Sequence, residues 1–300
     1  MRLFLNGFTF LKLIFEGKSL FVKGTAFPVN PQSACFIANN KFLTKSVLRS
    51  YKIPIPQSWL IRTAKEAKKI ILKKDLFPCV LKPVRGSHGN KVFANIESLE
   101  EFDEVLPLVF DTPGKKDILI EKFIKGKDYR LLVIGDKASA AMERIPAHII
   151  GDGLSNIHQL IKKFNQNCLV GENYEKPLCK IRLDGEIKRN LKKQDKKLTY
   201  VPQKNEKLFL RQNADISTGG SVKMLLMKYH ELKEIAIKAV KVIGMVIAGV
   251  DIIYDPLVNK PYILELNDCP GIDIHHFPVF GQSRKVASDI VEFLFKKTIH

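Results

Sequence analysis

The stretch AGVDIIYDPLVNKPYILELNDCPG, residues 248–271, decides the fold because it reads as a β-hairpin with polar side chains on one face. Two apolar runs flank Asp, Pro and Asn residues of the kind that turns use. If residues 256–260 form the loop, Tyr254 pairs with Tyr262 and the strands stay in register. The segment therefore predicts an antiparallel strand pair near the end of the chain.

The predicted register gathers three oxygen-bearing side chains. Side chains alternate across a strand, so Glu265 and Asn267 share a face, and Asp251 falls opposite Glu265. Two carboxylates and an amide oxygen suit Mg²⁺, which takes one or two carboxylates and leaves its other positions to water and phosphates. The hairpin alone is equally compatible with a half-exposed surface strand pair, whose outer face is ordinarily polar.

Composition and charge exclude several classes of protein. The 300 residues are 45% hydrophobic and 27% charged, as in folded chains with a large core or two to three lobes. The formal charge is +18, but 39 of the 49 basic residues are Lys, whereas nucleic-acid-binding surfaces rely on Arg and stacked aromatic rings. We therefore expect no nucleic-acid partner, while a basic face can still attract acidic substrates or ATP.

Cysteine spacing and hydropathy bear on the compartment. The five cysteines form no CxxC pair and no even framework, which indicates reduced thiols in a cytoplasmic protein and no zinc site. Asn6, Gly7 and Lys12 interrupt the apolar N-terminus, and no small-residue cleavage site follows, so we expect no signal peptide. No run approaches the roughly 18 apolar residues of a membrane helix, so no membrane partner is expected. Homo-oligomerisation is left open.

The order of predicted elements indicates two α/β lobes after a short β segment. A strand–turn–strand pattern occupies residues 10–22, and helices alternate with strands from Thr63 to Phe123. Ser98 and Glu101 have capping-box spacing at the start of one helix. The expected units are a short N-terminal β segment (1–40), an N-terminal lobe (41–124) and a C-terminal lobe (125–300) with a loop-rich insertion at about 151–205.

A basic run, Lys188 to Lys197, lies within this insertion. No aromatic residues interleave its lysines, so a solvated surface is favoured over a nucleic-acid patch. An amphipathic helix over 228–243 is expected to pack under the hairpin, and another helix over 286–295 closes the chain.

A lysine beside a glycine-bearing loop is a candidate phosphate site. Lys82 ends the buried-looking strand CVLKP, and the loop that follows contains Gly86 and Gly89. A lysine and the backbone N–H groups of such a loop can hold phosphates. On this segment alone, an ordinary hairpin turn is the better explanation of a lone glycine pair.

Two further segments lie where a nucleotide or an anion could bind. Residues 121–124 fall at the junction of the lobes with Asp128 just beyond, so backbone groups can read an adenine edge and a carboxylate can accept from ribose. The segment LRQNADISTGG presents Arg211 and Asn213 ahead of residues 217–220, a run that suits anion binding through backbone N–H groups.

Taken in this order, the motifs resemble the ATP-grasp superfamily and, within it, the ATP-grasp regions of cyanophycin synthetases and bifunctional glutathione synthetases. The resemblance runs from about Cys35 to Phe295 and rests on NNKFLTKSVLRSYKIPIP, KPVRGSHGNKVF, RIPAHIIGDG, LRQNADISTGG and ELNDCPGIDIHHFP. It implies an α+β ATP-grasp fold in which two α/β lobes clamp ATP, with a truncated N-terminal segment. It also implies an ATP-dependent, ADP-forming carboxylate–amine ligase in which an amine attacks an acyl phosphate.

The resemblance also implies a role for particular residues. For ATP the implied residues are Lys41, which we prefer to Lys45, and Lys82, Gly86, Ser87, His88, Gly89, Glu121, Lys122, Phe123, Ile124 and Asp128. Two Mg²⁺ ions, with Mn²⁺ as an alternative, are held by Asp251, Glu265 and Asn267. The implied catalytic residues that neutralise the acyl phosphate or line its pocket are Arg211, Arg130, Arg144 and Asn213. The implied substrate-side residues are Ser217, Thr218, Gly219, Gly220, Asp273 and His275.

Departures from the family pattern bear on the substrate. The large N-terminal domain and the Mur-ligase-like module of cyanophycin synthetases have no counterpart in this sequence, so cyanophycin polymerisation is not expected. Asp273 stands where those enzymes lead us to expect Arg, which favours a free amine or basic group over an acidic substrate. Asp215 replaces an expected Asn, and the glycine loop is sparser than usual after Gly89.

We therefore predict an amide or peptide ligase that acts on an amino acid or short peptide. A ligase that modifies the end of a protein or peptide chain is an alternative, and it predicts an open groove near residues 151–205. An ATP-binding regulatory protein without catalysis is an alternative from another class.

Overall fold

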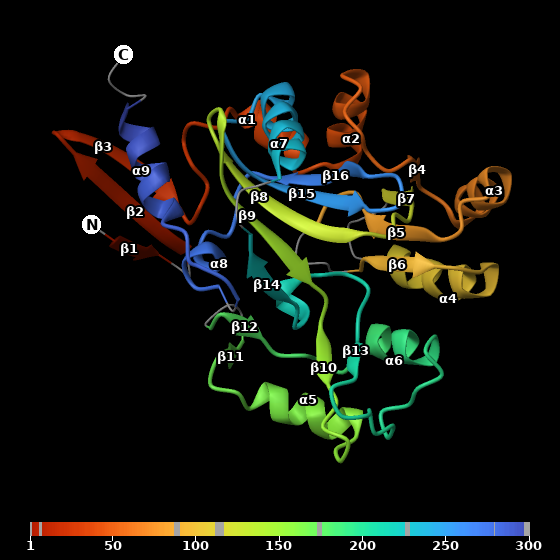
Figure 1. The fold of residues 1–300 in the computed structure, drawn as a ribbon. Helices are drawn as coiled ribbons and strands as arrows, with labels where there is room; N and C mark the ends of the chain where they lie inside the picture. Colours follow the sequence, from red (N-terminus) through yellow and green to blue (C-terminus); the bar gives the residue numbers. More distant parts are fainter. Residues whose placement is uncertain are drawn as a thin grey trace.

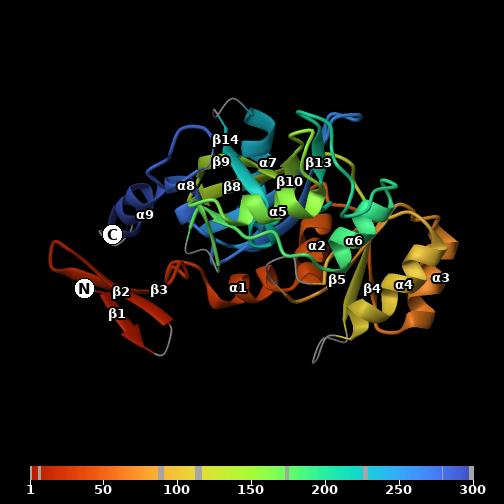
Figure 2. The same ribbon diagram turned by 90° about the horizontal axis from the view of Figure 1, so that it is seen from below.

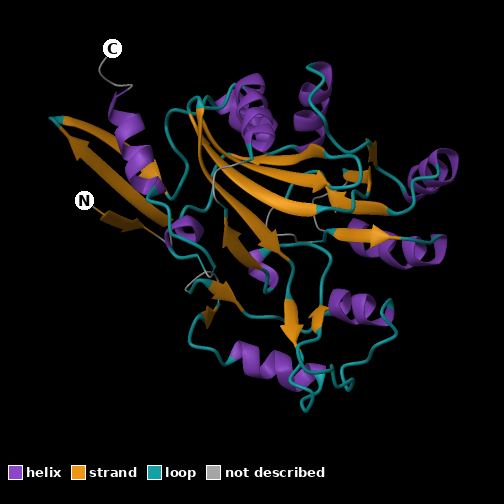
Figure 3. Ribbon diagram, viewed as in Figure 1, coloured by secondary structure: helices purple, strands orange, loops and turns teal. Residues whose placement is uncertain are grey.

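The computed structural model describes residues 2–5, 8–86, 91–111, 117–172, 176–225, 229–278 and 280–296. Two sheet-centred lobes lie side by side, with a smaller unit beneath them and an N-terminal sheet at one side (Figures 1 and 3). Ser87, His88 and Gly89, which the resemblance assigns to ATP, lie outside the described residues.

A five-stranded antiparallel sheet forms the C-terminal lobe, with the strand order β14-β9-β8-β15-β16. Its strands are β8 (Lys127–Ile134), β9 (Lys137–Ile145), β14 (Ser221–Met224), β15 (Ile247–Asp255) and β16 (Lys260–Asn267). The helices on one face are α1 (Gln32–Ala38), α2 (Lys41–Ser50) and α7 (His230–Ile243) (Figure 1). Ala34 and Ala38 of α1 and Leu48 of α2 are buried in the same core, so both sides of the expected boundary between residues 40 and 41 pack against this sheet.

The opposite face of this sheet is charged at one end and apolar at the other. Along β8 the side chains of this face are, in order, Asp128, Arg130, Leu132 and Ile134. Leu132 and Ile134 lie in a second core together with α9 (Val286–Lys296), whereas Asp128 and Arg130 line a cavity. The strand thus places a polar site directly beside the core that holds it in position.

A four-stranded antiparallel sheet of order β4-β7-β5-β6 forms the N-terminal lobe. Its strands are β4 (Ser58–Ile61), β5 (Cys79–Pro83), β6 (Phe93–Ile96) and β7 (Ile118–Lys122), and α3 (Ala64–Lys74) and α4 (Leu99–Phe110) cover one face. Ser98 caps α4 by accepting the N–H of Glu101, but the Glu101 carboxylate accepts from Glu97 and not from Ser98. Only half of the predicted capping box therefore forms.

The hairpin of β15 and β16 forms as predicted, with one error in register. Asp251 lies opposite Glu265, as the alternation predicted. Tyr254 pairs with Pro261, so the predicted pairing with Tyr262 is wrong by one residue. Both pairings occur in the same hairpin because the register of the two strands shifts between Asp251 and Ile252.

A β-bulge accounts for the shift. The register changes next to Asp251, where Leu264 is the extra residue on β16. Ile263 and Leu266 are both buried in the core, three residues apart instead of two. The bulge therefore allows the adjacent residues Leu264 and Glu265 both to line the cavity.

The segment expected as a loop-rich insertion, residues 151–205, contains short helices and strands with a core of their own, which the sequence did not predict. Its elements are α5 (Ile157–Asn165), β11 (Val170–Gly171), β12 (Leu178–Cys179) and α6 (Gly185–Lys192), and the flanking strands β10 (His148–Ile150) and β13 (Lys207–Phe209) pair with each other. Ile157, Leu160, Ile187 and Leu191 are buried together in a core of their own. The many lysines of the segment obscured this apolar stripe in the sequence.

The N-terminal residues form a three-stranded antiparallel sheet of β1 (Arg2–Leu5), β2 (Phe8–Phe15) and β3 (Lys18–Lys23). The predicted strand–turn–strand pattern is confirmed by β2 and β3, and β1 was not predicted. The sheet packs against α9, where the ring centroids of Phe15 and Phe295 lie 5.5 Å apart. Of the helices in the described ranges, none combines the length and the hydropathy needed to span a membrane.

Candidate functional site

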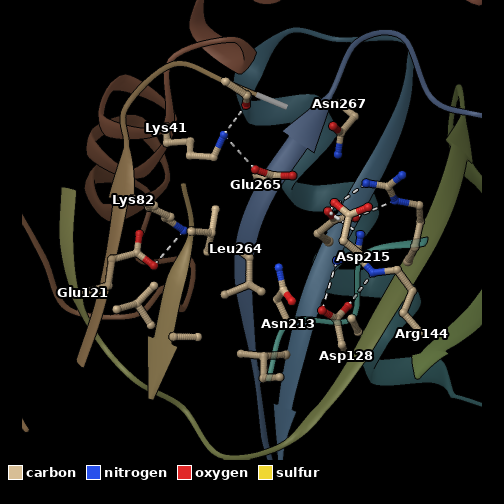
Figure 4. A pocket seen from close by; sticks show the side chains of 18 of the residues that line it. Lys41, Lys82, Glu121, Asp128, Arg144, Asn213, Asp215, Leu264, Glu265 and Asn267 are labelled. Carbon is tan, nitrogen blue, oxygen red and sulfur yellow. Dashed lines mark hydrogen bonds and ion pairs between the residues drawn. The ribbon is translucent and has the colours of Figure 1, made fainter. Parts of the chain in front are cut away.

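A cavity of about 790 Å³ lies between the two sheets and collects side chains from both lobes (Figure 4). The predicted site residues that line it are Lys41, Lys82, Gly86, Glu121, Lys122, Phe123, Ile124, Asp128, Arg130, Arg144, Asn213, Asp251, Glu265, Asn267 and Asp273. These residues span more than 200 positions of the sequence and thus line one cavity.

Three buried charges lie together on the N-terminal side of the cavity, and two of them, Lys82 and Glu121, line it. The carboxylate of Glu121 lies 2.8 Å from Lys82 Nζ and 3.0 Å from Lys45 Nζ, and all three side chains are nearly inaccessible to solvent. Burial alone would raise the pKa of Glu121, but the two ammonium groups hold it below its ordinary value. Burial lowers the pKa of Lys45 to about 8, against the opposing effect of Glu121.

The lowered pKa of Lys45 makes stability depend on pH in a defined direction. Between pH 8 and 10.5 the unfolded chain holds the proton of Lys45 more tightly than the folded chain does. The contribution of Lys45 to the free energy of unfolding therefore rises as pH increases through this window. We expect denaturant titrations to show the wild type gaining stability relative to Lys45→Met across it. A difference in the free energy of unfolding between the two proteins that stayed constant from pH 8 to 10.5 would contradict a lowered pKa of Lys45.

Lys41 and Lys45 occupy different environments although they are one helical turn apart. Lys41 Nζ donates to the carbonyl oxygen of Gly86 at 2.8 Å and lies 3.0 Å from the carboxylate of Glu265, so it bridges the glycine-bearing loop and β16. Lys45 is 1% exposed and is not among the residues that line the cavity. This arrangement supports Lys41 as the lysine that meets a phosphate.

Two arginines organise the carboxylates of the five-stranded sheet. Arg130 binds Asp251 through two hydrogen bonds of 2.6 and 2.8 Å, and Arg144 binds Asp128 through two of 2.8 and 3.1 Å. Arg144 also lies 3.1 Å from Asp251. Burial alone would raise the pKa of Asp251, but Arg130 and Arg144 hold it well below its ordinary range. Burial raises the pKa of Asp128, and the charge of Asp251 adds to the effect of burial.

The donor set fits Mg²⁺, with Asp251 as the most constrained donor. Glu265 keeps 27% of its side chain exposed toward the cavity, and the Asn267 amide nitrogen is buried without a partner among the described residues. Two carboxylates and an amide oxygen match the preference of Mg²⁺ for a few protein oxygens. No group of three or more His, Cys, Asp or Glu within the described ranges could hold a metal, which is consistent with a set that has only two carboxylates.

Asn213 is unpartnered within the cavity wall. Both its amide nitrogen and its amide oxygen are buried, and neither has a hydrogen-bond partner in the described part of the chain. Figure 4 shows the side chain between Leu264 and the Arg144–Asp128 pair. A buried amide without partners is costly, so a bound polar group that satisfied it would be favoured.

The run Ser217 to Gly220 does not present free backbone donors, contrary to the expectation of an anion site there. The carboxylate and carbonyl of Asp215 accept the N–H groups of Ser217, Thr218 and Gly220, and Ile216 accepts that of Gly219. These bonds close the 3₁₀ turn η1 (Ile216–Thr218). The run instead shapes the wall, since Ile216 and Asp215 line the cavity.

Two other predicted residues lie outside the cavity lining. Arg211 is 3% exposed and binds Asp184 and Glu186 within the small unit, so its charge is already neutralised. His275, on α8 (Asp273–His276), is 1% exposed, and burial together with Arg130 lowers its pKa to about 3. A neutral, buried His275 supports the wall and does not reach the cavity.

Several lining residues were not predicted as site residues. Ile253 and Leu264 give the cavity an apolar floor, and Asp268 and Cys269 follow β16 at its rim. Ile253 could have been found, because it alternates with Asp251 along β15. Leu264 depends on the bulge, which no motif in the sequence indicates.

Two antiparallel sheets that enclose a cavity, with lysines on one side and the Asp251, Glu265 and Asn267 set on the other, define an ATP-grasp fold. The chain belongs to the RimK-like ATP-grasp domain family, whose family model matches residues 38–166 and 202–281. The predicted resemblance is thereby confirmed.

Relatives that are similar over most of this chain are considerably longer proteins. The chain is 34% identical over 266 residues to a cyanophycin synthetase of Crocosphaera subtropica, which covers 86% of this chain and 30% of that protein. It is 38% identical over 269 residues to the glutathione biosynthesis bifunctional protein of Clostridium perfringens, covering 86% of this chain and 34% of that protein. The chain thus spans about a third of the length of these relatives.

Solved structures share the fold. A bifunctional glutathione synthetase from Pasteurella multocida superposes with a TM-score of 0.66 and 28% identity, over 96% of this chain and 41% of that one. A D-alanine–D-alanine ligase from Bacillus anthracis superposes with a TM-score of 0.54 and 16% identity, over 89% of this chain and 71% of that one. The second similarity concerns the fold alone.

Proposed function

We propose that the chain is an ATP-dependent carboxylate–amine ligase that forms an amide or peptide bond through an acyl phosphate. The observation that carries the proposal is the single cavity in which Lys41 and Lys82 face Asp251, Glu265 and Asn267. Cations on one wall and oxygen donors on the other suit a nucleoside triphosphate with its divalent ion. A cyanophycin synthetase and a bifunctional glutathione synthetase are among the relatives named above, in keeping with this reaction class.

In the proposed reaction the γ-phosphoryl group passes from ATP to an oxygen of the substrate carboxylate, and ADP leaves. The amine nitrogen then attacks the acyl carbon, the C–O bond to phosphate breaks, and the nitrogen loses a proton. Lys41 and Lys82 neutralise phosphate charge, while residues 121–124 hold the adenine. Arg130 and Arg144 fix the carboxylates of Asp251 and Asp128 so that the phosphoryl group is met by preorganised charges.

Asp251, Glu265 and Asn267 would hold Mg²⁺, which would supply positive charge to neutralise the phosphates. We propose that two ions bind, with Mn²⁺ as an alternative to Mg²⁺. Arg130 and Arg144 keep Asp251 ionised, so its carboxylate is ready to serve as a ligand at neutral pH.

We propose an amino acid or a short peptide as substrate. Asp273 is exposed at the cavity wall and supports an acceptor that carries a free amine or basic group. The alternative of a ligase acting on a chain end required an open groove near residues 151–205. That unit instead has its own core and contacts the N-terminal lobe, which favours a small substrate.

ADP release in the presence of pooled amino acids and dipeptides tests the proposal. We expect release above the ATP-only background with at least one pool, together with a product mass equal to the two substrates less water. A protein that binds ATP but releases no ADP with any pool would be an ATP-binding regulatory protein, and the ligase proposal would be wrong.

A further inference from the structure

The basic run Lys188–Lys197 contacts the N-terminal lobe through two of its members. Arg189, on α6, lies 2.5 Å from the carboxylate of Glu101, on α4. Lys193 lies 2.9 Å from Glu101 and 3.2 Å from Glu97. The helices α6 and α4 lie next to each other in both views of the fold (Figures 1 and 2). We call the contact of Arg189 and Lys193 with Glu97 and Glu101 the clasp.

The Arg189–Glu101 pair of the clasp is shielded from solvent, whereas Glu97 is 56% exposed, and the clasp reaches the backbone of the N-terminal sheet. The side chains of Arg189 and Glu101 are 14% and 12% exposed. Arg189 also donates to the carbonyl oxygen of Ala94 at 3.3 Å, and Lys193 donates to that of Asn95. Exposed ion pairs contribute little to stability, whereas desolvated, charge-assisted hydrogen bonds such as these are roughly twice as strong as neutral ones.

The backbone that the clasp holds belongs to the wall of the cavity. Val92 and Ala94 line the cavity, and β6 is hydrogen-bonded to β5, which carries Lys82. The small unit that supplies Arg189 is continuous with the five-stranded sheet through β9 and β10. The clasp therefore ties one wall of the cavity to the opposite lobe.

The range matched by the family model includes only one side of the clasp, Glu97 and Glu101. The family model matches residues 38–166 and 202–281, and α6 and Lys193 fall in the stretch between them. Other members of the basic run do not take part. Lys192 is exposed on the same helix, and no described residue forms an ion pair with it.

We propose that Arg189 and Lys193 are positioning residues that hold the two lobes closed over the nucleotide, so that breaking the clasp governs nucleotide exchange. Their effect on turnover rests on the proposed function. Their effect on the rate of nucleotide release does not require that any substrate be ligated.

The dissociation rate of a fluorescent ATP analogue, measured by stopped-flow displacement with unlabelled ATP, tests this inference in the full chain. We expect Arg189→Gln and Glu101→Gln each to speed release about 10-fold, because truncating one partner of a desolvated pair acts mainly on dissociation. The two effects should be less than additive in the double variant, since both changes remove the Arg189–Glu101 pair, whereas the Lys193–Glu101 pair is lost only with Glu101. Arg189→Lys should recover most of the wild-type rate.

Lys192→Gln is the matched control, because it removes one positive charge from the same helix without touching the clasp. Its release rate should equal that of the wild type, and thermal unfolding of every variant shows whether the fold is retained. Equal release rates in the wild type, Arg189→Gln and Glu101→Gln would overturn this inference but not the proposed function. Fully additive effects of the two substitutions on the release rate of the double variant would also overturn it. A wild-type chain that bound no nucleotide would overturn the proposed function as well.

Discussion

Glu265→Gln is expected to lower turnover by about 10²–10³-fold while nucleotide binding persists in weakened form. Glu265 lies opposite Asp251 on the hairpin, 3.0 Å from Lys41, with 27% of its side chain exposed to the cavity. Glutamine keeps the size of the side chain and one acceptor oxygen, but it replaces the other oxygen with an NH2 donor and removes the charge. On the proposed function, the ion that accompanies ATP would lose charge compensation, whereas the proposed contacts of residues 121–124 with the adenine would be retained.

Steady-state ADP release measures the turnover of this variant, and equilibrium titration with the fluorescent ATP analogue measures its affinity. Glu143→Gln is the matched control, since Glu143 lies on β9 of the same sheet but does not line the cavity. Turnover of Glu265→Gln at the control's level would refute the assignment of Glu265 as a metal ligand.

Glu121→Leu is expected to lower the free energy of unfolding by about 3–5 kcal/mol, because it leaves two buried cations without their counter-charge. Glu121 is 2% exposed and is the shared partner of Lys45 and Lys82, whose side chains are 1% and 8% exposed. Partial deprotonation of Lys45, with its pKa of about 8, relieves part of this cost as pH rises. The loss should therefore be smaller in alkaline solution.

Chemical denaturation at two pH values measures both effects. Glu104→Leu, on the exposed side of α4 in the same lobe, provides a control in which the lost carboxylate has no buried partner. Lys45→Met should also cost less than Glu121→Leu, since Lys82 and Glu121 remain as a balanced pair. Equal stability of Glu121→Leu and the control would show that these lysines do not need the carboxylate.

The local patterns of the sequence were reliable where they depended on residues close together in the chain. Strand alternation placed Asp251 opposite Glu265. The helix expected over 228–243 is observed as α7, because its apolar positions recur at helical spacing. The order of the motifs also identified the ATP-grasp family, which the family model confirms.

Patterns failed where a residue's partner lies far along the chain. Arg211 was expected to meet an anion, but Asp184 and Glu186 neutralise it within the small unit. The glycine run after Asp215 was expected to offer free N–H groups, but the turn itself uses them. The sequence could not predict either result, because each depends on which carboxylate and carbonyl oxygens the fold brings close to the donor groups.

By itself, the sequence determined the class of fold, the metal-ligand candidates of the hairpin and the lysines that face them, since periodicity and motif order carry that information. The tertiary structure alone decided the bulge at Leu264, the sharing of Glu121 by two lysines and the clasp of Arg189 with Glu101. Arg189 and Glu101 lie 88 positions apart. Such pairings follow from the packing of lobes against one another, and the desolvation that gives them their strength exists only once those lobes meet.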